Sequence, residues 1–158
     1  MGFEKRKGIR TRNNSMKKND YNKALNIARS AHAGQVDKGG QDYINHSIKI
    51  ASMVKRTDEK IVAVLHDVCE DSETTLKDLR KLGFSRKIVK AVDAITKREG
   101  ERYRDYIKRV SRNRIARVVK IADSTHNSDI SRIARPTESD IRRCAKYSET
   151  IDRLNELI

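Results

Sequence analysis

Residues 61–72 read Ile-Val-Ala-Val-Leu-His-Asp-Val-Cys-Glu-Asp-Ser, an apolar run followed directly by a dense group of acids. The five apolar residues 61–65 are too hydrophobic for a wholly exposed helix, so we expect them to be buried. The acids therefore lie at the end of a buried element, which is the position that a functional site requires.

The polar part of this stretch has helical spacing. If residues 65–71 continue one helix, His66 and Glu70 share a face, as do Asp67 and Asp71, because each pair is four residues apart. So many acids close together are costly unless a cation lies among them or some carboxylates are protonated. The segment is therefore a candidate cation site.

Apolar residues at helical spacing recur on both sides of this segment. Few residues favour tight turns, since the 158-residue chain has one proline and seven glycines, and no segment alternates for long enough to predict a strand. The length suits one domain. We predict an all-α single-domain helical bundle, with helices over residues 20–33, 43–56, 58–68, 75–83, 85–95, 115–126 and 137–154, and with Asp58, Ser85 and Thr137 among the helix-starting residues.

The charge is uneven along the chain. The net charge is +14, and residues 1–18 carry seven lysines and arginines against one glutamate. These residues lack a sustained amphipathic period, so we predict a basic flexible arm over 1–18 and the domain over 19–158. Residues 97–120 are also basic, whereas residues 66–78 are acidic. A basic molecule with one acidic pocket suits a cation inside it and a polyphosphate outside it, although weak nonspecific contact of the arm with nucleic acid is an alternative.

Neither a membrane segment nor a disulfide framework is predicted. No stretch is apolar enough to span a bilayer, and the polar N-terminus lacks the apolar region of a signal peptide. Cys69 and Cys144 are far apart and form no Cys-x-x-Cys unit, so we expect free thiols in a reducing cytoplasm. The sequence predicts no oligomeric state.

A second polar group follows another apolar run. Asp123, His126 and Asn127 share a helical face after residues 118–122, and His46 lies near the start of an earlier helix. A single histidine is more often structural than a ligand, but the order His, His-Asp, Asp, with each at the edge of an apolar run, is more specific. Two imidazoles and two carboxylates suit a divalent metal such as Mn, Fe or Zn, which polarises a phosphoryl oxygen and activates water.

These motifs resemble those of the HD-superfamily phosphohydrolases, and more closely the hydrolase domain of RelA/SpoT proteins and small stand-alone hydrolases like it. The resemblance covers about residues 21–135 and rests on five motifs in the family's order. They are Ala-His-Ala-Gly-Gln (31–35), Tyr-Ile-Asn-His (43–46), Leu-His-Asp-Val-Cys-Glu-Asp-Ser (65–72), Val-Asp-Ala-Ile-Thr-Lys (92–97) and Lys-Ile-Ala-Asp-Ser-Thr-His-Asn (120–127).

The resemblance implies an HD-type fold, one Mn²⁺ ion and cleavage of the 3′-pyrophosphate from guanosine tetra- and pentaphosphate, the nucleotides of the stringent response. It assigns residues to three roles. The implied ligands are His46, His66, Asp67 and Asp123; the residues that handle the water are Glu70 and Asp71; the substrate contacts are Lys38 and Asn127.

Three positions depart from the family's pattern. Asp37 stands where an arginine is usual, Ser124 replaces another arginine, and proline is missing before Tyr43. The metal-binding motifs are complete, whereas the residues expected to contact the nucleotide are changed. A different nucleotide substrate therefore remains an alternative, which restoring arginine at position 37 tests. A noncatalytic nucleic-acid-binding module is the third hypothesis.

Overall fold

The computed structural model describes residues 3–157, and their side chains from Ser15 onward. The helices, in chain order, are α1 (Phe3–Ala31), α2 (Tyr43–Met53), α3 (Thr57–Leu65), α4 (Val68–Asp71), α5 (Leu76–Lys81), α6 (Arg86–Ile95), α7 (Tyr103–Ser111), α8 (Arg114–Asn127), the 3₁₀ helix η1 (Ile130–Arg132) and α9 (Glu138–Glu156). Apart from one isolated bridge between Val36 and Asp42, these residues form no β-structure. The all-α prediction is confirmed.

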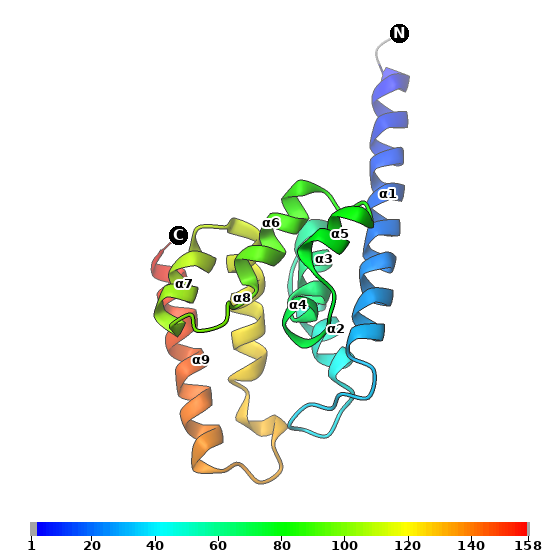
Figure 1. The fold of residues 1–158 in the computed structure, drawn as a ribbon. Coiled ribbons are helices and arrows are strands. Elements are labelled where there is room, and N and C mark those ends of the chain that lie inside the picture. The colour runs from blue at the N-terminus through cyan, green and yellow to red at the C-terminus, as the bar shows by residue number, and fades with distance from the viewer. Residues whose placement is uncertain (1–2, 158) are drawn as a thin grey trace.

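Helix α3 forms the centre of the bundle. It packs against α1, α2, α6 and α8, and Figure 1 shows it among the helices that α1 flanks on one side and α8 and α9 on the other. Each of residues 61–65 is at most 1% exposed, as the apolar run predicted. Helix α3 therefore holds whatever follows Leu65 in the interior of the molecule.

Predicted helix starts agree with the structure where a hydroxyl side chain caps the helix. Ser85 accepts a hydrogen bond from the backbone N–H of Ile88, and Thr137 from that of Asp140. Asp58 is not a cap, contrary to the prediction: the N-cap position of α3 is Arg56, and Asp58 instead pairs with Lys87 at 2.6 Å.

Helix α3 ends at Leu65, short of the helix predicted over 58–68 and of its possible continuation through residue 71. His66 and Asp67 form a turn, and α4 begins at Val68. The Nδ1 of His66 lies 2.6 Å from the carbonyl oxygen of Ala63, to which the N–H of residue 67 would donate in a continuous α-helix. The imidazole thus takes the place of a backbone donor, and His66 and Asp67 lie in the turn between α3 and α4.

The basic segment over 1–18 differs from the prediction in its backbone. From Phe3 onward it is helical and continuous with α1, whose first half projects beyond the bundle (Figure 1). The segment contains no proline that would stop a helix. Its separation from a domain over 19–158 stays a prediction, and residues 1–2 lie outside the described part.

Helix α9 completes the bundle. It packs on α8 and α7, and its Leu154 is fully buried. The hydroxyl of Thr150 lies 2.8 Å from that of Tyr103 on α7. Cys69 and Cys144 are unpaired, as expected. No helix in the described residues has the length and apolar character needed to cross a membrane.

Candidate metal centre and its cavity

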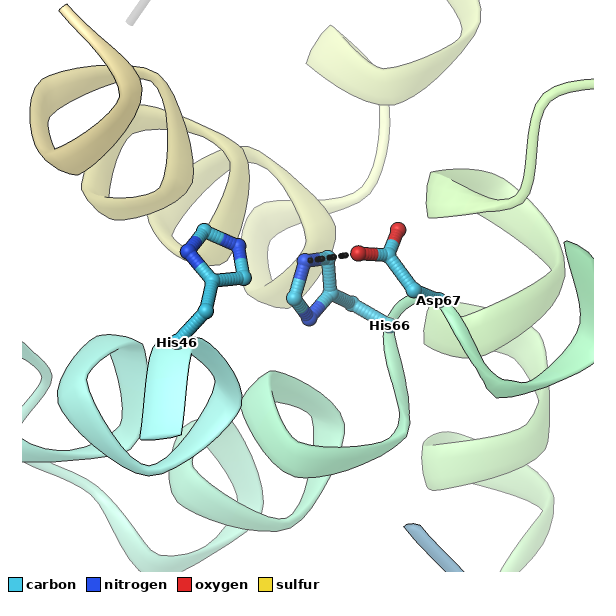
Figure 2. Close-up of side chains that lie close together, drawn as sticks. All are labelled: His46, His66 and Asp67. Carbon is cyan, nitrogen blue, oxygen red and sulfur yellow. Dashed lines mark ion pairs between the residues drawn. The ribbon is translucent and has the colours of Figure 1, made fainter. Parts of the chain in front are cut away.

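Three elements bring the four predicted ligands together. His46 comes from the first turn of α2, His66 and Asp67 from the turn after α3, and Asp123 from α8. Figure 2 shows the two imidazoles and the Asp67 carboxylate directed toward one another, with α8 behind them. Ligand atoms of His46, His66 and Asp67 all lie within 4.8 Å of one another.

Asp123 closes the group from α8. Its Oδ1 lies 3.1 Å from Nε2 of His46 and 3.6 Å from Nε2 of His66. The side chains of His46 and His66 are each 2% exposed and that of Asp123 is 5% exposed, whereas that of Asp67 is 21% exposed. Three of the four side chains are therefore buried, and Asp67 is the accessible one.

The environment of His66 tests whether a metal fits. Because Nδ1 donates to the carbonyl of Ala63, Nε2 is the ring nitrogen that faces the carboxylates, and a metal ion there would take the place of its proton. That nitrogen is buried, has no hydrogen-bond partner within the described part of the chain, and lies 3.0 Å from Oδ2 of Asp67. Burial lowers the pKa of His66, but Asp67 and Asp123 more than offset it and the pKa is well above its usual range. The site thus favours positive charge among these atoms, and its nitrogen and oxygen donors suit a divalent transition metal.

His46 has a partner that orients it. Its Nδ1 lies 2.8 Å from Nδ1 of His126 on α8. Burial, with Arg132 nearby, lowers the pKa of His126 to about 4, so His126 is neutral at pH 7. When Nδ1 of His46 carries the proton and donates to His126, Nε2 of His46 is free to bind a metal. His126 is therefore a support for the ligand set.

Two side chains from α8 hold Asp123. Nζ of Lys120 donates to Oδ2 at 2.8 Å, and Nδ2 of Asn127 donates to Oδ1 at 2.7 Å. Burial raises the pKa of Asp123, but Lys120 and the two histidines lower it by more. The net pKa is well below the usual value, so the carboxylate is ionised. Asn127, predicted to contact substrate, thus also positions Asp123.

Tyr43 fixes the remaining carboxylate. Its hydroxyl donates a short hydrogen bond to Oδ2 of Asp67, and its ring packs against that of His32. Burial and the neighbouring charge of Asp67 raise the pKa of Tyr43, so the phenol remains protonated and keeps donating.

The two predicted water-handling acids lie on α4, next to the ligands but outside their cluster. Glu70 accepts from the backbone N–H of Lys97, and Oδ2 of Asp71 lies 3.8 Å from Nδ1 of His32. Loss of hydration raises the pKa of both carboxyls, and the charge of Asp67 adds to the effect. Raised pKa values suit carboxyl groups that exchange protons.

A cavity of about 270 Å³ opens beside His46. One wall is the loop before α2, and the other is formed by the end of α8, η1 and α9. Its lining residues are Val36, Asp37, Lys38, Gly39, Tyr43, His46, Asn127, Asp129, Arg132, Ile133, Arg143 and Tyr147. Lys38, the second predicted substrate contact, lies on this rim, where Nζ is 2.9 Å from Oδ1 of Asp140.

Several residues around the site were not predicted from the sequence. Lys120 had a signal, because it is a lysine within the apolar run 118–122 and three residues before Asp123. Arg132, Arg143 and Tyr147 had none, since they reach the cavity only through the packing of η1 and α9. Tyr106, next to Lys120, is buried and donates to the carbonyl of Ile95.

Known proteins share both the sequence and the fold. The chain is 31% identical over 141 residues to guanosine-3′,5′-bis(diphosphate) 3′-pyrophosphohydrolase of Haemophilus influenzae, covering 80% of this chain and 20% of that protein. It is 29% identical over 142 residues to the bifunctional (p)ppGpp synthase/hydrolase SpoT of Escherichia coli, covering 80% of this chain and 19% of that protein. The chain thus spans about a fifth of the length of these relatives.

A solved structure of a metazoan ortholog of SpoT, described as hydrolysing ppGpp, has a TM-score of 0.72 with this chain. The match covers 85% of each chain at 21% sequence identity, and it shows a shared fold. The family model described as HD domain matches residues 24–143, which include all four predicted ligands. The chain belongs to the HD domain family.

Proposed function

We propose that the chain is a metal-dependent hydrolase of nucleotide polyphosphates, with guanosine 3′,5′-bis(diphosphate) as the first candidate substrate and pyrophosphate as a product. The observation that carries this proposal is the buried Nε2 of His66, which has no hydrogen-bond partner in the described residues and faces the carboxylates of Asp67 and Asp123. The activities named for the relatives support the substrate class.

The proposed metal is Mn²⁺, and its ligands would be His46, His66, Asp67 and Asp123. We also propose that the protein is cytoplasmic. A bound divalent ion supplies charge for the phosphoryl oxygens and lowers the pKa of water. The surrounding residues keep the donors oriented: Ala63 fixes the tautomer of His66 and supports this arrangement.

The acids on α4 have a separate role in the proposal. Glu70 and Asp71 lie near Asp67, and their raised pKa values allow a carboxyl group to take a proton from water and return it to a leaving group. Asn127 keeps Asp123 in place from within the cavity, and Lys38 offers an ammonium group at its rim.

Asp37 favours a second candidate, a nucleotide other than guanosine tetraphosphate, because it places an acid in a loop where the family usually has an arginine. A noncatalytic module that touches nucleic acid through the basic first half of α1 is the remaining alternative. It predicts binding with a steep dependence on salt and no hydrolysis.

The test is pyrophosphate release from guanosine 3′,5′-bis(diphosphate) by the purified chain with added Mn²⁺. We expect Asp67→Ala to reduce the rate by at least about a hundredfold, since even partners of metal ligands affect activity by this order. Asp152→Asn is the matched control, because this carboxylate is exposed on α9 and does not line the cavity. Mn²⁺ binding without release of pyrophosphate would reject the substrate and retain the metal site, whereas absence of Mn²⁺ binding would reject both.

A further inference from the structure

Both carboxylate oxygens of Asp37 accept hydrogen bonds from within the protein. Oδ1 of Asp37 accepts from the backbone N–H groups of Gly39 and Gln41 at 2.8 and 3.0 Å, and Oδ2 accepts from a terminal nitrogen of Arg132 at 2.8 Å. Its side chain is 12% exposed. Asp37 therefore shapes the loop and binds a guanidinium, and it presents little free acceptor capacity to a ligand.

Arg132 is held at two points across the cavity wall. One terminal nitrogen bonds Asp37, and the other donates to the carbonyl oxygen of His126 at 3.1 Å. A guanidinium has five N–H groups, so three have no hydrogen bond to any described side chain or backbone group. Arg132 is 24% exposed at its side chain and lines the same cavity as His46. It is thus an oriented donor beside the metal centre.

The ion pair of Asp37 and Arg132 has no net charge, but its guanidinium still has N–H groups that can donate hydrogen bonds to a ligand. An incoming phosphate would meet the negative charge of Asp37 as well as the guanidinium, so the pair is a poor phosphate site. A neutral group with acceptors in one plane fits better, and arginine is well matched to the O6 and N7 atoms of guanine. Adenine has an amino group in place of O6 and would oppose one donor to another.

We propose that Arg132, oriented by Asp37, is the residue that selects a 6-oxopurine base over a 6-aminopurine in the cavity. This inference rests on the proposed function. It also gives Asp37 a role. In the family's pattern this loop itself carries an arginine, whereas here the guanidinium belongs to Arg132 of η1 on the opposite wall, and Asp37 holds it in place.

The first experiment compares guanosine and adenosine 3′,5′-bis(diphosphate) with the wild type and Arg132→Gln. The readouts are the ratio of kcat/KM values and, with metal-free protein, the ratio of Kd values from calorimetry. We expect Arg132→Gln to reduce the preference for guanosine about tenfold or more, which is the scale of one lost bidentate contact. Arg135→Gln, an equal loss of charge at an exposed residue of the following loop, should leave both ratios unchanged.

The outcomes separate this inference from the proposed function. A wild type that binds guanosine nucleotide selectively through Arg132 but releases no pyrophosphate supports the inference while rejecting the reaction. Equal ratios in the wild type and Arg132→Gln overturn the inference, whatever the activity. Failure of the wild type to bind or hydrolyse either nucleotide when Mn²⁺ is present overturns both.

A second variant tests the role of Asp37 as a positioning residue. Asp37→Asn keeps an oxygen for the loop N–H groups but removes the charge that holds Arg132. We expect the base preference to fall while affinity for both nucleotides rises, because an uncompensated guanidinium attracts phosphate. A lower affinity for both with unchanged preference would contradict this role. Asp37→Arg is the poorer test, since arginine has no acceptor for the loop and would face Arg132.

Discussion

Nζ of Lys120 lies 2.8 Å from Oδ2 of Asp123, and only 12% and 5% of the two side chains are exposed. Lys120 also lies over the ring of Tyr106, 5.5 Å from its centroid. The ammonium group of Lys120 thus compensates the buried negative charge of Asp123, one of the proposed ligands. This compensation does not require a bound metal.

Replacing Lys120 by methionine should lower the free energy of unfolding of the metal-free protein by about 3 kcal/mol, because Asp123 would remain buried without its partner. Urea unfolding measures the change, and added Mn²⁺ should reduce it. Lys90→Met is the control, since Lys90 is exposed and should cost about 0.5 kcal/mol or less. Equal losses in the two variants would argue against the charge compensation.

Metal binding itself should stabilise the protein. At a free Mn²⁺ concentration one hundred times Kd, the free energy of unfolding should rise by about 2.7 kcal/mol, which corresponds to about 8 °C in Tm for a chain of this size. Thermal melts with and without chelator measure the shift. Asp67→Asn should abolish it, whereas Asp152→Asn should preserve it. A persistent shift in Asp67→Asn would place the ion elsewhere.

The pair of Glu101 and Arg109 should make stability depend on pH. The hydrogen bond from Arg109 lowers the pKa of Glu101 to about 2, below the value of about 4.3 for an unfolded chain. The stabilisation is therefore complete above about pH 5 and is lost as the pH falls toward 2.

Glu101→Gln should accordingly lower Tm by about 3 °C at pH 7, from the loss of about 1 kcal/mol. The difference from the wild type should shrink as the pH falls below 4, which calorimetric melts at several pH values measure. A difference that stays constant down to pH 2 would show that packing, and not charge, is responsible.

Gly34 should be sensitive to substitution although it has space around it. Its φ is +77°, and a Cβ would meet no atom within 4 Å. The cost of Gly34→Ala is therefore conformational, about 1 kcal/mol in urea unfolding. Gly34→Asn should cost less, because asparagine adopts the left-handed region more readily. Equal costs would mean that the loop changes conformation on substitution.

The fold and the ligand cluster were predictable from local patterns. Periodic apolar residues define most of the helices, and the caps at Ser85 and Thr137 need only short-range hydrogen bonds. The four ligands were expected from the family resemblance, and the structure brings their side chains together from three elements. The turn at His66 was not predictable, because it depends on the competition of one imidazole for a backbone oxygen.

The cavity was also not predictable, for a different reason. Its polar contacts join distant parts of the chain: Asp37 and Arg132 are 95 positions apart. No periodicity relates such residues, and their approach depends on how η1 and α9 pack. In the sequence, Asp37 replaces the positive charge usual in the family with a negative one. In the fold, Arg132 neutralises that negative charge.

Helix α9 forms part of the cavity wall opposite the loop before α2, and this affects the order in which the site assembles as the protein is synthesised. All four proposed ligands lie between residues 46 and 123, whereas Arg143 and Tyr147 follow them, and Lys38 meets Asp140 across 102 positions. Because a chain leaves the ribosome from its N-terminus, the proposed ligands emerge before α9 and can come together before α9 docks on α8. If the proposed function holds, nucleotide capture would wait for α9 to dock, and a nascent chain would load metal before it binds substrate.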